Sequence, residues 1–118
     1  TFYKKYILSS AAVEEASRSN YMELFNTINA ALGSVRSAGA YDQLALYNST
    51  FMLLYDQRSS MASVNVEMNA VLSLMDGVYT SAKNLSVQKE QSKELRSEIL
   101  DNYEEYTEEI KRTYSNAA

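Results

Sequence analysis

The sequence contains no cysteine, histidine, proline or tryptophan, and its only glycines are Gly33, Gly39 and Gly77. Without cysteine the chain can form neither disulfides nor thiolate metal sites, and it has no thiol nucleophile. Without histidine it lacks the commonest general base and the commonest metal ligand. Because proline and glycine are the residues that interrupt helices, their scarcity favours long helices.

The side chains that remain for chemistry are carboxylates, lysines, tyrosines and hydroxyls, and they form no catalytic motif. The sequence has no glycine-rich phosphate loop and no glycine elbow around a serine. A di-iron bundle needs Glu-x-x-His pairs, which a chain without histidine cannot supply. We therefore expect a protein that is not an enzyme and that uses no metal and no cofactor.

The chain has 118 residues, which is the size of one domain, and a formal net charge of −4. The negative charge disfavours nucleic acid as a partner, because phosphate binding depends on clustered lysines and arginines. The most apolar stretch, residues 51–55, is too short to cross a bilayer. Since the chain starts with threonine, we expect a mature chain or an excised domain, with any flanking membrane segments outside this sequence.

Large apolar residues recur every three or four positions, which is the period of a helix with one buried face. A first stripe, from Tyr21 to Val35, predicts a helix over residues 2–38 that ends in a turn at Gly39. A second stripe, from Leu44 to Leu54, predicts a helix over residues 41–57.

The last stripe runs from Leu95 to Tyr114 and predicts an amphipathic helix over residues 86–115. Most of its glutamates fall off the stripe, so the outer face of this helix is expected to be acidic and solvated. Lys111 and Arg112 lie in its final turn, where the helix dipole favours cations.

Five polar residues at positions 56–60 leave two architectures open. In the first they form a turn, Ser59 or Ser60 caps a third helix over residues 60–83, and the protein is an all-α, up-and-down antiparallel bundle of four helices with long first and last helices. In the second, one long helix continues to Gly77, giving three long helices in a spectrin-like arrangement. We favour four helices, because a continuous helix would place Arg58 and Asn65 on its buried stripe.

Three arginines are candidate ligand-binding residues. In the four-helix arrangement Arg18, Arg58 and Arg96 come from three helices at similar heights. Planar guanidinium groups that converge between helices would bind a carboxylate or another small anion. In the alternative interpretation each arginine pairs locally, as Arg18 can with Glu14 four residues earlier. Arg36, near the first turn, is a single residue and makes a weaker candidate.

Part of the last stripe is a candidate interface. Tyr103, Tyr106, Ile110 and Tyr114 follow it. The tyrosines suit either the core or a subunit interface, since an aromatic ring can be buried while its hydroxyl reaches the rim. From this stripe we expect a homodimer.

The plan of a long first helix, two shorter middle helices and a long last helix resembles the extracytoplasmic four-helix sensor domains of bacterial chemoreceptors and sensor histidine kinases. The stripes at 21–35, 44–54, 61–78 and 95–114 carry this resemblance and cover most of the chain. It implies a dimer formed through the first and last helices, and a ligand bound between helices. It also implies that displacement of the last helix relative to the first transmits the signal.

The resemblance further implies a location at the extracytoplasmic face of a bacterial membrane. Residues 2–6, with Tyr6, and residues 110–114 would then form a membrane-proximal stalk, and the three arginines would contact the ligand. The alternative function is a structural or protein-interaction bundle, a spacer or a secreted adaptor without a small-molecule ligand. The positions of the two chain ends distinguish the sensor from the spacer. An even number of antiparallel helices brings the ends together, as the sensor requires, whereas three helices place them apart.

Overall fold

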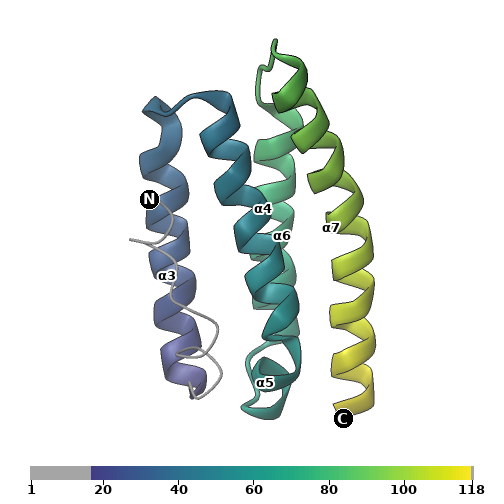
Figure 1. Cartoon of the computed structure of the whole chain (residues 1–118). Coiled ribbons are helices and arrows are strands. Elements are labelled where there is room, and N and C mark those ends of the chain that lie inside the picture. Colours follow the sequence, from purple (N-terminus) through teal and green to yellow (C-terminus); the bar gives the residue numbers. More distant parts are fainter. Residues whose placement is uncertain (1–16, 118) are drawn as a thin grey trace.

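The computed structural model describes residues 17–117, and the regular structure in this part of the chain is entirely helical (Figure 1). Three helices have 17 residues each, and a fourth, α7, has 28. A single 3-10 turn, η1, follows α3, and a six-residue helix, α5, lies between α4 and α6. The bounds are α3 Arg18–Ser34, η1 Val35–Ser37, α4 Ala40–Asp56, α5 Arg58–Ser63, α6 Met68–Asn84 and α7 Glu90–Ala117. The predicted all-α helical bundle is confirmed.

The first described helix is shorter than the sequence pattern predicted. Ser17 has an extended backbone (ψ 171°) at the position before α3, so the expected helix over residues 2–38 does not run through it. Residues 2–16 of that prediction lie outside the described part of the chain. At its other end α3 stops at Ser34, before η1. Within residues 17–117, α7 alone exceeds 17 residues, so a long first helix is not found there.

The chain reverses direction between α5 and α6, and the turn is built around Asn65. Asn65 has a positive φ of 62°, a conformation that asparagine tolerates better than most residues. The Val66 N–H donates to the Met61 carbonyl over 2.9 Å, and the Asn65 N–H donates to the Ala62 carbonyl over 3.2 Å. These two bonds are the Schellman pattern that ends a helix, and the buried side chains of Val66 and Met61 complete it.

This turn corrects the predicted boundary between the second and third helices. The turn was expected at residues 56–60, with a third helix over 60–83, but α5 occupies 58–63 and the long helix starts at Met68. Neither Ser59 nor Ser60 caps α6, which begins after Glu67. The reversal also rules out the spectrin-like alternative, in which one helix would have continued to Gly77.

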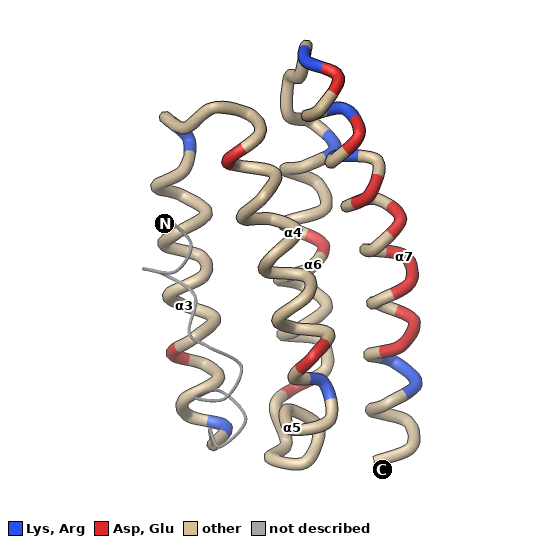
Figure 2. Tube along the Cα trace, viewed as in Figure 1, with Lys and Arg blue, Asp and Glu red and all other residues tan. Residues whose placement is uncertain are grey.

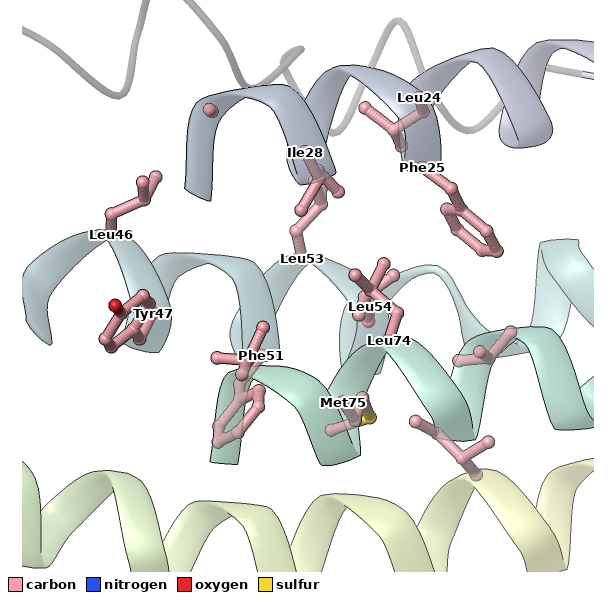
Figure 3. Close-up of a cluster of buried hydrophobic side chains, with 14 of the residues drawn as sticks. Leu24, Phe25, Ile28, Leu46, Tyr47, Phe51, Leu53, Leu54, Leu74 and Met75 are labelled. Carbon is pink, nitrogen blue, oxygen red and sulfur yellow. The ribbon is translucent and has the colours of Figure 1, made fainter. Parts of the chain in front are cut away.

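The helices form three layers. The pair α4 and α6 lies in the middle, α3 covers one side of it and α7 the other (Figures 1 and 3). From α3, Leu24, Phe25 and Ile28 are buried towards α4, which presents Leu46 and Leu53 (Figure 3). The receptor resemblance implied that the first and last helices act together. In the structure, the first and last described helices, α3 and α7, lie on opposite sides of the α4 and α6 pair.

The direction of the helices alternates, so both ends of the described chain lie at one end of the bundle. Figure 1 shows that α3 begins, and α7 ends, beside α5. The opposite end carries η1 and the loop between α6 and α7.

Candidate functional site

Arg18 and Arg58 both lie at the α5 end of the bundle but have separate partners. The Arg18 guanidinium is 3.7 Å from the Glu67 carboxylate, in an exposed ion pair. Arg58 donates from Nε to the Thr113 hydroxyl over 3.1 Å and from Nη1 to the Tyr55 carbonyl over 2.8 Å. Its guanidinium also lies 4.1 Å from the centre of the Tyr55 ring. The side chain of Arg58 therefore links α5 to α7 by a hydrogen bond.

Arg96 lies at the other end of the bundle. It is in the first two turns of α7, and its Nη1 donates to the carbonyl of Leu85, directly after the end of α6, over 2.7 Å. Arg18 pairs with Glu67, directly before the start of α6. The 17 residues of α6 span about 25 Å. The predicted level of three arginines is therefore wrong, because α7 begins at the end of the bundle opposite α5 and Arg96 lies close to its start.

The residues predicted for a subunit interface lie against other helices of the same chain. Tyr103 stacks on Tyr79 of α6, with ring centres 4.1 Å apart, and Tyr106 stacks on Tyr55 of α4 at 4.3 Å. Ile110 is fully buried, and Tyr114 is half-buried. Tyr6 lies outside the described residues. These contacts assign the described part of the stripe to the fold of one chain, and a homodimer stays a prediction.

A different arginine, Arg36 in η1, lines a cleft between α3, α4 and α6. Of the five arginines in the sequence, it alone has neither a hydrogen bond nor an ion pair to another described residue. The cleft holds about 300 Å³. Its described lining is Asn29, Leu32, Gly33, Arg36, Tyr47, Ser73, Leu74, Gly77, Val78 and Ser81. Arg36 is exposed, so its guanidinium is accessible to a solute.

Hydroxyl groups accompany Arg36 at the cleft. Burial raises the pKa of Tyr47, while a hydrogen bond with Ser81 and the positive charge of Arg36 act to lower it. All three residues line the same cleft. A guanidinium beside two hydroxyls is a set of donors suited to a small anion.

Two glycines keep the cleft open. Gly33 on α3 and Gly77 on α6 are exposed, and a Cβ atom added to either would meet nothing within 4 Å. Close packing of the helices therefore does not require these glycines, and the missing side chains leave space. The apolar wall is made by Leu32, Leu74 and Val78.

Charge is distributed unevenly over the molecule. Figure 2 shows acidic residues along the outer side of α7, while the middle turns of α3, α4 and α6 carry few charges. No described residue that lines the cleft is acidic. The positive charge of Arg36 is therefore not neutralised inside the cleft by any carboxylate of the described lining.

Within residues 17–117, no three acidic side chains are grouped so that they could hold a metal ion. None of the helices described has both the length and the apolar character that crossing a membrane requires.

Arg36 is a single residue near a turn, so the sequence carries only a weak signal for it. Its partners come from α4 and α6, far away in the sequence. The one local signal was the pair of glycines at positions 33 and 77, which are otherwise unfavourable within helices.

Comparison with protein-family models finds no match to this chain, and comparison with curated proteins and with solved structures finds no significant similarity.

Proposed function

We propose that this chain is a ligand-sensing helical bundle that binds a small anion in the cleft between α3, α4 and α6. The observation that carries the proposal is Arg36, an accessible arginine without a protein partner among the described residues, beside the hydroxyls of Tyr47 and Ser81. A guanidinium in an open cleft favours an anionic ligand because it offers planar, paired donors with a permanent charge.

The signal in this proposal is a displacement of α3. The cleft lies where α3 meets α6, and the groups that would hold the anion come from both sides of it. Arg36 is in η1, which directly follows α3, and Ser81 is on α6. A ligand bound by both would favour a state in which they lie closer together. Because a ligand shifts an equilibrium only through its different affinity for two states, α3 must have two positions relative to α6.

The wider role that we propose is the extracytoplasmic sensor domain of a bacterial transmembrane receptor, such as a histidine kinase or a chemotaxis receptor. The start of α3 and the end of α7 lie at the same end of the bundle, which is compatible with two connections to one membrane (Figure 1). The moving helix in this version is α3 relative to α4 and α6, because α3 and α7 are separated by that pair.

The binding step is tested by titrating the protein with sodium acetate and sodium phosphate at constant ionic strength. The readout is the NMR signal of the arginine Nε–H groups. We expect the Arg36 signal to shift saturably, and Arg36→Gln to abolish the anion-induced changes elsewhere. Arg112→Gln is the matched control, since Arg112 pairs with Glu109 on the outside of α7.

The displacement is tested with spin labels on cysteines introduced at Asn26 of α3 and Asn69 of α6, both exposed. The chain has no native cysteine, so each label is unique. A saturating anion should change the distance between the labels in the parent protein and leave it unchanged when Arg36→Gln is added. Absence of binding by either anion contradicts the proposal and favours a protein-interaction or spacer bundle without a ligand.

A further inference from the structure

We infer that the ligand of this cleft is a short unsubstituted alkyl monocarboxylate, an inference that rests on the anion-binding function proposed above. The argument uses the kind, number and arrangement of the groups that line the cleft. The charges of the lining disfavour two classes of small anion, and the shape and apolar wall of the cleft favour an alkyl chain.

The charges of the described lining select a single carboxylate. Arg36 is the one cation there, and no lining residue is acidic. A dicarboxylate would leave its second charge without a partner, and an amino acid would leave its ammonium group without a counter-charge. Desolvating an uncompensated charge is costly, so both classes are disfavoured.

The charged group lies near one end of the cleft. Arg36 is in η1, which directly follows α3, and Ser81 lies one turn before the end of α6, so both are near the end of the bundle that carries η1. The uncharged side chains of Asn29 and Ser73 line the other end, and Ser73 is eight residues before Ser81 on α6, which is about 12 Å along the helix axis. The cleft is therefore elongated along α6, with its charged group near one end.

The wall between these ends suits an alkyl chain. Most of the accessible apolar surface there belongs to Leu32, which is half-buried, because Leu74 is only 8% exposed and Val78 is fully buried; the space left by Gly33 and Gly77 lies beside them. A carboxylate bound by Arg36 and the hydroxyls of Tyr47 and Ser81 would place its alkyl chain along this apolar wall. Burial of each methylene from water then adds to the affinity.

The experiment is isothermal titration calorimetry at neutral pH with the sodium salts of acetate, butyrate and hexanoate, and with succinate and norleucine. Norleucine is hexanoate with an added 2-amino group, so the pair isolates the effect of the ammonium charge. A fully buried methylene should tighten binding about fourfold. We expect hexanoate to bind at least tenfold more tightly than acetate, and norleucine and succinate to bind more weakly than hexanoate.

Two variants locate the binding. Arg36→Gln should abolish it, whereas Arg112→Gln should leave it unchanged. Gly77→Leu places a large side chain in the cleft without altering the polar groups, and it should weaken hexanoate more than acetate. Gly77→Ala is the control for the loss of glycine, and circular dichroism of both variants verifies the helical fold.

The possible outcomes separate the ligand class from the proposed function. Binding of succinate or norleucine as tightly as hexanoate, lost in Arg36→Gln, overturns the monocarboxylate inference and leaves the anion cleft in place. Equal affinities for acetate and hexanoate overturn it in the same way. Hexanoate binding that persists in Arg36→Gln is nonspecific association with apolar surface and overturns both.

Discussion

The Tyr21 hydroxyl of α3 donates a hydrogen bond to the Gln57 side-chain oxygen over 3.1 Å, and the two residues are 0% and 2% exposed. Gln57 is the single residue between α4 and α5, so the bond fixes α3 to the point where the chain leaves α4. A buried polar side chain is stable only when it is hydrogen-bonded. The position of this break in the helix is thus tied to a partner 36 residues away.

Tyr21→Phe should lower the free energy of unfolding by about 1 kcal/mol, because it removes this bond and leaves the Gln57 oxygen without this donor. Urea unfolding measures the change. Tyr41→Phe is the control, since Tyr41 is 50% exposed and its hydroxyl can bind water. If the two variants lose the same stability, the buried bond makes no net contribution.

The hydroxyl of Tyr114, unlike that of Tyr21, is buried without a hydrogen bond to a described residue. Burial, followed by the nearby Tyr21 and the Glu67 carboxylate, raises the pKa of Tyr114 from 10.0 to about 12. Burial is also the main cause of the raised pKa values of Tyr47, Tyr103 and Tyr106.

These shifts predict a loss of stability at alkaline pH. Above pH 10 the unfolded chain releases tyrosine protons that the folded chain retains, so the unfolded state binds fewer protons and the free energy of unfolding falls as pH rises. For Tyr114 the fall extends from about pH 10 to about pH 12. Urea unfolding from neutral pH to pH 12 should show this decline.

The variant Tyr114→Phe measures how much Tyr114 contributes to the loss of stability at alkaline pH. The decline in stability between pH 10 and pH 12 should be shallower in the variant, and the remaining slope should include the contributions of Tyr47, Tyr103 and Tyr106. An identical slope in the parent and the variant would show that Tyr114 is as easily ionised in the folded chain as in the unfolded chain.

Arg58 should not be replaceable by lysine without loss of stability. The guanidinium bonds both Thr113 and the Tyr55 carbonyl while it lies over the Tyr55 ring, and an ammonium group cannot reproduce this planar arrangement. We expect Arg58→Lys to cost about 1 kcal/mol in the free energy of unfolding. Arg18→Lys is the matched control, because its ion pair with Glu67 is exposed and contributes little.

Hydrogen exchange gives a second measurement for Arg58→Lys. Amide protons in the last turns of α7 should exchange faster than in the parent, since Thr113 loses its bond to α5. Unchanged protection of these amides would mean that Arg58 does not hold the end of α7 in place.

The sequence by itself determined that the protein is helical and which face of most helices is buried. The three-and-four spacing of apolar residues located the buried faces of α3, α4 and α7, and Gly39 marked the first turn. These are local properties, because the helical period and the backbone preferences of glycine do not depend on distant partners.

The tertiary structure alone decided where the second reversal lies. Residues 56–60 are polar and resemble a turn, but Gln57 is buried against Tyr21, and Arg58 is held by Tyr55 and α7. With these polar groups satisfied, a helix continues as α5 until Asn65 adopts its left-handed conformation. A polar stretch does not reveal in advance whether the partners that allow its burial exist.

The candidate site also depended on the tertiary structure. The height of a residue in a bundle follows from the direction of its helix and from its distance along that helix. Arg96 lies in the first two turns of α7, which begins at the η1 end, so about the length of α6 separates it from Arg18 and Arg58. The apolar period predicts that Tyr103, Tyr106 and Ile110 face a packing surface, but not whether that surface belongs to the same chain or another. Arg36, a weak candidate in the sequence, becomes the strongest one because packing brings α4 and α6 beside it and leaves no carboxylate in the described lining of the cleft.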